Sequence, residues 1–298
     1  MPYDESPETD GAERIAVPQA GQVVEITAEG ATLSGRFFRA EGQACRAGLV
    51  IHAATGVPQG FYRAFAEWAA GQGIAVLTYD YRDFGASATG HARDSKASFA
   101  DWMLKDQRAA EVRLAELVSE GPLWMLGHSL GGLGFPFRPL EDRMERIITF
   151  GSGFAYHWDH PWHYMPAVFS FWFWIIPVLT RFAGYMPGRK LLLGTDLPAR
   201  VYWQWRHWCT SRDFYLGEVG VTLPQPDFSA QGRKIRILAS PDDVMVPPSA
   251  VGRYAGQFDE GAVKVGSLQA QKYGLRKLGH IDAFSIRNKA AWADMLGI

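Results

Sequence analysis

The chain has 298 residues, of which 47% are hydrophobic and 20% charged, and its formal net charge is −1. This length allows one large domain, or one domain with an insertion, built around a substantial core. The near-neutral, interspersed charge argues against a nucleic-acid-binding protein. Residues 1–13 are acidic and lack the pattern of a secretory signal, and Cys45 and Cys209 lie far apart. We therefore expect a cytoplasmic protein with reduced thiols.

Apolar runs predict strands throughout the first third of the chain. Residues 22–28 and 31–39 alternate in hydrophobicity, as an antiparallel hairpin does. Residues 48–52 and 74–79 form continuous apolar runs, and the segment 61–70 between them has the pattern of a helix.

The alternation of helices and strands continues downstream. A long amphipathic helix is predicted over 99–119, and an apolar strand follows it, ending before a glycine-rich turn and a further helix. Later strands are predicted at 146–150, 235–239 and 263–268, with a terminal helix after them. Strands that alternate with helices indicate an α/β fold with a mostly parallel central sheet, whose active loops lie at the carboxyl edge.

The glycine-rich turn carries the strongest chemical signal. Residues 127–131 read Gly-His-Ser-Leu-Gly and come directly after the apolar run 123–126. A serine at a sharp turn from strand to helix has strained backbone angles, and glycines on either side relieve the crowding. The hydroxyl of Ser129 then stands clear of the sheet beside backbone N–H groups. We predict that Ser129 is a catalytic nucleophile.

An acid and a histidine follow Ser129 in the chain order that a serine hydrolase of this kind needs. Asp242 and Asp243 come after the strand at 235–239 and before a Val-Pro pair that can open a helix. Asp243 is favoured as the acid by its spacing to that pair, and Asp242 is the alternative; the other aspartate is expected to cap a helix. His280, preceded by Gly279, is the predicted general base.

The oxyanion formed during acyl transfer needs two N–H donors. The backbone of Leu130 is one predicted donor. The second is expected from the loop after the strand at 48–52, where either Ala53 or Ala54 can supply it.

These motifs resemble the α/β-hydrolase fold over nearly the whole chain. The resemblance rests on residues 127–132, on 80–87 (Asp-Tyr-Arg-Asp-Phe-Gly-Ala-Ser), on 243–247 (Asp-Val-Met-Val-Pro) and on the Gly-His pair at 279–280. Members of this superfamily usually have Arg-Gly where this chain has Arg82-Asp83, and His-Gly where it has His52-Ala53. The superfamily includes esterases, lipases, thioesterases, amidases and acyltransferases, so the fold alone does not choose the reaction.

An insertion separates two parts of the predicted core, which comprises residues 1–152 and 233–298. The inserted residues 153–232 are more than one crossover helix needs, and the resemblance implies a helical cap here. Seven of the eleven tryptophans fall within it: Trp158, Trp162, Trp172, Trp174, Trp203, Trp205 and Trp208. We expect an apolar roof over Ser129. The predicted substrate-binding side chains are those of His128, Trp158, Trp172, Trp205 and Trp208.

Two cap helices are predicted. Residues 167–179 carry no charge, but they fall short of the roughly 20 residues of a spanning helix and contain Pro177. We interpret them as a cap helix, with a face that touches a membrane as the alternative. A second helix is predicted after Asp196 as N-cap, with Pro198 in its first turn. Residues 184–189, 194–198 and 204–209 also resemble the cap of a bacterial subgroup of predicted α/β-hydrolases, a likeness that supports the fold and does not choose the reaction.

Three histidines in the cap, His157, His160 and His163, raise the question of a metal site. Pro161 interrupts their spacing, and no matching Cys or Glu set accompanies them. We predict no metal and no cofactor, and interpret these histidines as polar members of an aromatic cap.

The sequence thus predicts a serine hydrolase that cleaves an ester or thioester of a moderately large, apolar acyl or aryl substrate through Ser129, His280 and Asp243. The alternative is an acyltransferase that passes the same acyl group to an alcohol or amine. A third hypothesis is a non-catalytic protein that binds an apolar ligand. The sequence leaves the oligomeric state open.

Overall fold

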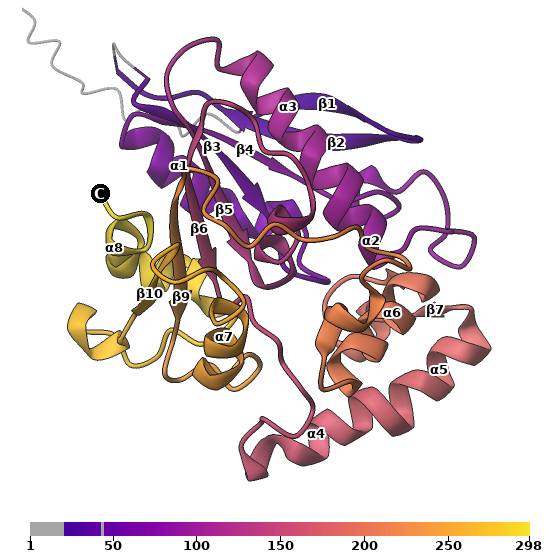
Figure 1. Cartoon of the computed structure of the whole chain (residues 1–298). Coiled ribbons are helices and arrows are strands. Elements are labelled where there is room, and N and C mark those ends of the chain that lie inside the picture. The colour runs from indigo at the N-terminus through magenta and orange to yellow at the C-terminus, as the bar shows by residue number, and fades with distance from the viewer. Residues whose placement is uncertain (1–20, 43–44) are drawn as a thin grey trace, which may run out of the picture.

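An eight-stranded, mostly parallel sheet forms the centre of the structure, a computed structural model that describes residues 21–42 and 45–298 (Figure 1). The strand order is β1-β2-β4-β3-β5-β6-β9-β10. Only β1 and β2 and the pair β2 and β4 run antiparallel, and the other neighbours are parallel. The acidic stretch at 1–13 lies outside the described residues.

The strands follow the apolar runs of the sequence, and the predicted fold class is confirmed. Every residue of β3, β4 and β5 is buried, which explains why these strands are continuously apolar and not alternating. The strands are β1 (Gln22–Ala28), β2 (Ala31–Phe38), β3 (Ala47–His52), β4 (Ile74–Tyr79), β5 (Leu123–His128), β6 (Met144–Phe150), β9 (Lys234–Ala239) and β10 (Val263–Ser267).

Helices flank this sheet. The predicted helix over 99–119 is α2 (Phe99–Asp101) continued through a π-helical turn, η3 (Trp102–Asp106), into α3 (Gln107–Leu117). The other core helices are α1 (Arg63–Gly71), α7 (Pro248–Ala255) and α8 (Trp292–Leu296), with 3-10 turns at η1 (Gln59–Tyr62), η2 (Gly85–Ser87), η10 (Ala270–Tyr273), η11 (Asp282–Phe284) and η12 (Ile286–Ala291).

The helix expected directly after Ser129 is shorter than predicted. The chain forms two 3-10 turns, η4 (Ser129–Gly132) and η5 (Phe135–Phe137). Gly131, Gly132 and Gly134 are poor helix formers, and Pro136 lacks an N–H group, so a longer helix is disfavoured here.

The loop after β4 explains one departure from the α/β-hydrolase pattern. Asp83, where relatives usually have glycine, adopts a left-handed backbone with φ of 56°. Aspartate tolerates this region better than most side chains. The change from glycine therefore keeps the turn.

The inserted residues 153–232 are here called the cap segment, and its helices lie to one side of the sheet in Figure 1. The predicted cap helix is longer than 167–179, because η6, α4, η7 and α5 form one continuous helix over Trp162–Ala183. The elements of the cap segment are η6 (Trp162–Tyr164), α4 (Met165–Phe169), η7 (Ser170–Trp174), α5 (Ile175–Ala183), β7 (Tyr185–Met186), η8 (Arg189–Leu191), β8 (Leu197–Pro198), α6 (Ala199–Thr210) and η9 (Phe214–Glu218).

The second cap helix, α6, exists as predicted, but its N-cap was wrongly assigned. Pro198 occupies the N-cap position, and no side chain caps the helix. Oδ1 of Asp196 instead accepts a hydrogen bond of 3.0 Å from the backbone N–H of Arg189. That contact closes the loop between η8 and β8.

Candidate active site

Ser129 stands at the end of β5 in a strained turn. Its φ is 55°, a left-handed value that costs free energy for a residue with a side chain. A methyl group at Gly127 would collide with the backbone of Gly132, and one at Gly131 with the carbonyl of His52. The glycines are therefore required for the turn that presents the Ser129 hydroxyl at the carboxyl edge of the sheet.

His280 and Asp243 form a buried pair. Nδ1 of His280 lies 2.6 Å from Oδ2 of Asp243, and their residues are 6% and 3% exposed. Oδ1 of Asp243 accepts hydrogen bonds of 2.9 Å from the backbone N–H groups of Met245 and Val246. Because the carboxylate accepts from Nδ1–H, Nε2 of His280 is left as the basic nitrogen.

The neighbouring Asp242 holds the backbone that carries this histidine. Its carboxylate accepts from the N–H groups of Leu278 and Gly279 at 2.9 and 2.7 Å, and from the Ser240 hydroxyl at 2.8 Å. Burial opposes its charge, but the backbone N–H groups, Ser240 and nearby Lys277 outweigh burial and lower the pKa of Asp242. The predicted helix-capping role for this aspartate was wrong, since it ties together two loops.

Gly151 was not identified from sequence as a site residue. It follows β6 with φ of 61°, and a Cβ atom here would lie 2.9 Å from the His280 ring and 3.3 Å from Oδ2 of Asp243. The absence of a side chain makes room for the pair. The sequence gives one signal that Gly151 leaves space for these two side chains: a glycine comes directly after a strand that ends at the site.

His128 does not line the cavity, so its predicted contact with substrate was wrong. It is fully buried, with Nδ1 at 2.7 Å from the Tyr62 hydroxyl and Nε2 at 3.1 Å from the backbone carbonyl of His280. A carbonyl only accepts, so Nε2 carries the proton and Tyr62 donates to Nδ1. Burial, with nearby His280, holds the pKa of His128 well below its usual value, which keeps the ring neutral.

Tyr62, which sequence reasoning missed, extends this chain of hydrogen bonds. Its hydroxyl accepts from the backbone N–H of Ala54 at 2.9 Å. The carbonyl of Ala53, the residue before Ala54, accepts a hydrogen bond of 3.0 Å from the Tyr81 hydroxyl. Two buried tyrosines thus fix the loop that was predicted to supply an oxyanion donor, while Ala54 and Leu130 line the cavity beside Ser129.

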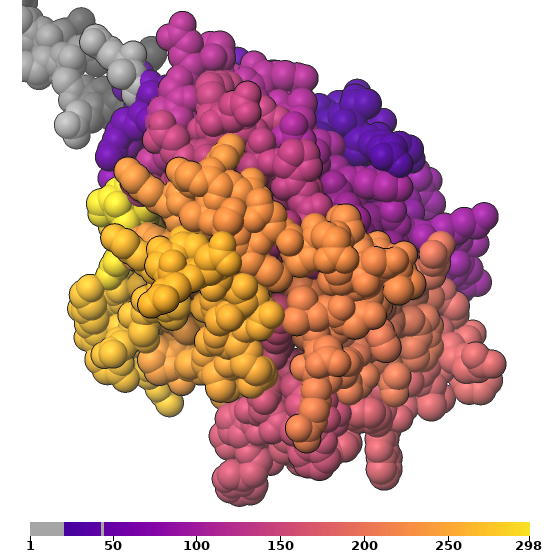
Figure 2. All heavy atoms as spheres, viewed as in Figure 1, coloured from indigo at the N-terminus to yellow at the C-terminus, as the bar shows by residue number. Residues whose placement is uncertain are grey.

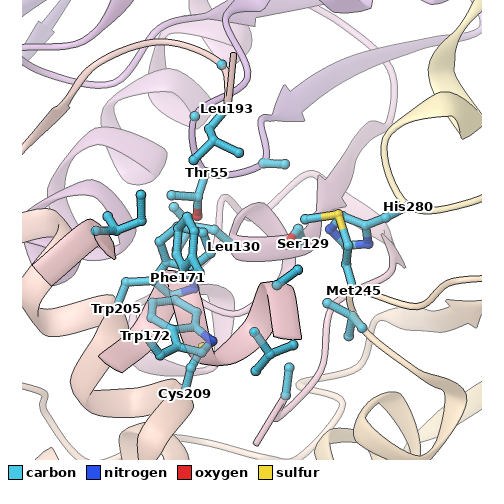
Figure 3. Close-up of a pocket in the computed structure, with 18 of the residues that line it drawn as sticks. Thr55, Ser129, Leu130, Phe171, Trp172, Leu193, Trp205, Cys209, Met245 and His280 are labelled. Atoms are coloured by element: carbon cyan, nitrogen blue, oxygen red, sulfur yellow. The ribbon is translucent and has the colours of Figure 1, made fainter. Parts of the chain in front are cut away.

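A cavity of about 670 Å³ opens over Ser129 and His280. In Figure 3, Phe171, Trp172 and Trp205 gather on one side of it, away from Ser129 and His280. The rings of Trp172 and Trp205 meet edge to face with centroids 4.9 Å apart. Most of the lining side chains are apolar, and they come from both the core and the cap segment. The site is a deep apolar pocket with the serine at its wall.

Two of the predicted substrate-binding tryptophans lie elsewhere. Trp158 is 61% exposed and does not line the cavity. Trp208 is fully buried behind the lining, where its indole N–H donates to Glu218 at 2.8 Å. Sequence spacing places residues on a helix face but does not say which face meets the cavity. Trp172 and Trp205 do line it.

The three cap histidines do not converge. His160 lines the cavity, and its Nδ1–H donates to the carbonyl of Val244 at 2.9 Å, whereas His163 is exposed and His157 buried. Across residues 21–42 and 45–298, no group of three His, Cys, Asp or Glu side chains is arranged to hold a metal.

Comparison with known proteins agrees with this architecture. Residues 45–188 match the family model described as serine aminopeptidase, S33 (Hydrolase_4). No curated protein matches the chain. A monoglyceride lipase from Saccharomyces cerevisiae in complex with a substrate analogue has a similar structure, with 15% identity, a TM-score of 0.59, and coverage of 99% of this chain and 97% of that one.

Two further structures share the fold at similar distance. The enol-lactonase of Burkholderia xenovorans is 17% identical with a TM-score of 0.54, and 92% of this chain and 100% of that one are covered. Mouse alpha/beta hydrolase domain-containing protein 10 is 14% identical with a TM-score of 0.53, covering 93% and 97%. The family match, the sheet order and the nucleophile turn together support membership of the α/β-hydrolase superfamily, whose fold this chain has.

Proposed function

We propose that the protein hydrolyses carboxylic esters, or thioesters, of moderately large apolar acyl or aryl groups. The observation that carries this proposal is the cavity of about 670 Å³, lined mainly by apolar side chains, with Ser129 and His280 at its wall. An apolar acyl group gains by leaving water for such a lining. The similar structures include a monoglyceride lipase and an enol-lactonase, which agrees with an ester as the substrate.

In the proposed acylation step, Ser129, His280 and Asp243 act together. His280 removes the proton of the Ser129 hydroxyl as the oxygen attacks the substrate carbonyl. Asp243, bound to Nδ1–H, stabilises the imidazolium that forms. The oxyanion of the tetrahedral intermediate is held by the N–H of Leu130 and by a second N–H of the loop after β3. Of the two predicted second donors, Ala54 already donates its N–H to the Tyr62 hydroxyl, which leaves Ala53.

Deacylation repeats these steps with water. The imidazolium of His280 gives its proton to the leaving alcohol, and the acyl group remains on Ser129. His280 then takes a proton from water, which attacks the acyl-serine and releases the acid. An alcohol or amine in place of water would give acyl transfer through the same intermediate.

The first test is covalent labelling with a fluorophosphonate. We expect one adduct, mapped to Ser129 by peptide mass and absent from Ser129→Ala. The same variant should lose at least about 10³-fold in kcat on a soluble aryl ester while its circular dichroism spectrum is unchanged. Undiminished turnover by Ser129→Ala, or a folded wild type that takes no label, would reject the proposal. Product analysis with an added alcohol separates hydrolysis from acyl transfer.

A series of 4-nitrophenyl esters tests the substrate class. We expect kcat/KM to rise from acetate to medium-chain esters, because each added methylene that leaves water contributes roughly 0.8 kcal/mol of binding. If kcat/KM is highest for the acetate ester, the proposed apolar acyl substrate is wrong. This conclusion would hold even if the fluorophosphonate labels Ser129.

A further inference from the structure

The long cap helix has one face on the protein and one face in solvent. Ile176 and Thr180 are buried, and Trp172 before them is buried against the cavity. Trp174, Val178 and Phe182 follow each other at intervals of four residues on the opposite side, and they are 71%, 53% and 86% exposed. The helix is therefore anchored along one stripe and presents a second, apolar stripe outward.

Other apolar side chains extend this surface. Leu192 and Leu193, in the loop after η8, are 93% and 47% exposed, and Trp162 at the start of the helix is 86% exposed. We call the following set the apolar face: Trp162, Trp174, Ile175, Val178, Phe182, Leu192 and Leu193. In Figure 1, α4 and α5 form the outer margin of the cap segment, and Figure 2 shows this segment projecting from the core. Soluble proteins rarely expose so many large apolar side chains together.

The apolar face continues into the cavity. Ile175, Leu192 and Leu193 are exposed and also line the cavity that contains Ser129. A molecule that leaves an apolar phase at this face therefore reaches the cavity along a continuous apolar path. A partner that merely covered the face would have no need for this continuity.

Within residues 160–195, which contain the whole apolar face, the charges have a single sign, and Asp159 and Asp196 flank this segment. Residues 160–195 contain no Asp or Glu, whereas Arg181, Arg189 and Lys190 in this segment are all exposed. Cations beside an exposed apolar helix are attracted to a bilayer that carries anionic headgroups. The tryptophans at the start and in the middle of this helix are also typical of side chains at a membrane–water interface. Trp162–Ala183 is also long and apolar enough to cross a membrane by length and composition, but its buried stripe packs on the protein, which favours a helix lying along the surface.

We propose that the apolar face docks on the surface of an anionic lipid bilayer, with the helix Trp162–Ala183 parallel to the membrane plane. Trp174, Val178 and Phe182 insert among the acyl chains, and Arg181, Arg189 and Lys190 meet the phosphates. The mouth of the cavity then opens against the lipid. Uptake of a bilayer-borne ester through this mouth rests on the proposed function, whereas the docking itself does not.

Vesicle flotation with the full chain tests the docking. We expect the protein to float with phosphatidylcholine vesicles that contain about 30 mol% phosphatidylglycerol, and less with phosphatidylcholine alone. The double variant Trp174→Ser/Phe182→Ser should bind at least about tenfold more weakly. Val265→Ser/Ile286→Ser, which removes two side chains that are each 60% exposed on the core, is the matched control and should bind as wild type does.

Activity on a soluble short ester shows whether each variant is correctly folded. Trp174 and Phe182 do not line the cavity, so their removal should leave this activity unchanged. Arg181→Gln/Lys190→Gln, which leaves Arg189 in place, should reduce the preference for phosphatidylglycerol and leave binding to neutral vesicles unaltered. Equal flotation of the wild type and the Trp174→Ser/Phe182→Ser variant would overturn the proposal.

Two more outcomes separate this proposal from its alternatives. Ser129→Ala should float as wild type does, because docking does not need the catalytic serine. A wild type that floats but neither takes the fluorophosphonate label nor cleaves an ester would leave the docking intact while the proposed function fails. If the wild type does not float but forms a concentration-dependent dimer that Trp174→Ser/Phe182→Ser abolishes, the apolar face is an interface between two copies and the proposal is wrong.

Discussion

Oδ2 of Asp243 lies 2.6 Å from Nδ1 of His280, while the carboxylate of Asp242 binds the backbone N–H groups of the two residues before that histidine. Two adjacent acids thus hold the same loop, one through the side chain of His280 and one through the backbone just before it. Asp243 therefore has the contact with the imidazole that the acid of the proposed triad needs. Their substitution should therefore have different consequences.

We expect Asp243→Asn to lower kcat by about 10³- to 10⁴-fold, because an amide no longer stabilises the imidazolium or fixes its tautomer. Asp242→Asn should reduce kcat by less than about tenfold and destabilise the fold by about 1–3 kcal/mol through weakened hydrogen bonds. Steady-state kinetics on a soluble ester and urea unfolding measure both effects. A larger activity loss in Asp242→Asn would identify that residue as the acid.

The lowered pKa of Asp242 predicts a dependence of stability on pH. Its folded pKa lies below the unfolded value, so its carboxylate stabilises the native state above the unfolded pKa. This contribution is lost as the pH falls through the lowered folded pKa. Urea unfolding of wild type and Asp242→Asn should show a difference at pH 7 and 5 that shrinks toward pH 3. A difference that stays constant over this range would contradict the assignment.

Tyr62→Phe should lower kcat by roughly tenfold with little change in KM, since the tyrosine hydroxyl links the loop of Ala54 to His128 and, through it, to the backbone of His280. The phenylalanine keeps the packing but leaves the Ala54 N–H and Nδ1 of His128 without their partner. We expect a loss of about 1–3 kcal/mol in the free energy of unfolding.

Tyr273→Phe is the control for Tyr62→Phe, because it removes a tyrosine hydroxyl far from the proposed reacting groups. It removes a hydrogen bond of 2.6 Å to Asp294 in α8, and neither residue lines the cavity, so kcat should be unchanged. If Tyr62→Phe retains kcat within about twofold, the chain of hydrogen bonds does not position the reacting groups.

The sequence predicted the sheet well because burial on both faces demands continuous apolar runs, as in β3, β4 and β5. It also predicted that His280 and Asp243 lie together, since the carboxyl ends of parallel strands share one edge. Tyr62 and Gly151 could not be found this way. Their roles depend on which distant segments the fold brings together, and local patterns do not contain that information.

The aromatic cap shows the same limit. The composition of the cap segment predicted an apolar roof, and Trp172 and Trp205 line the cavity. The composition did not distinguish these from Trp158, which is exposed, or Trp208, which is buried. The orientation of each indole depends on how η7, α6 and the loop before η6 pack, so the inward and outward tryptophans differ only in the folded structure.

This difference between tryptophans allows a matched test of the substrate pocket. Trp205→Ala removes a ring that lines the cavity, where it packs against Trp172 and Phe171. We expect kcat/KM for a medium-chain 4-nitrophenyl ester to fall by at least about tenfold relative to the acetate, because the acyl chain loses apolar contact. Trp158→Ala removes an exposed ring outside the cavity and should leave the ratio of the two rates unchanged. Equal losses on both esters in Trp205→Ala would mean that this tryptophan only supports the packing of the cap segment and that the acyl chain lies elsewhere.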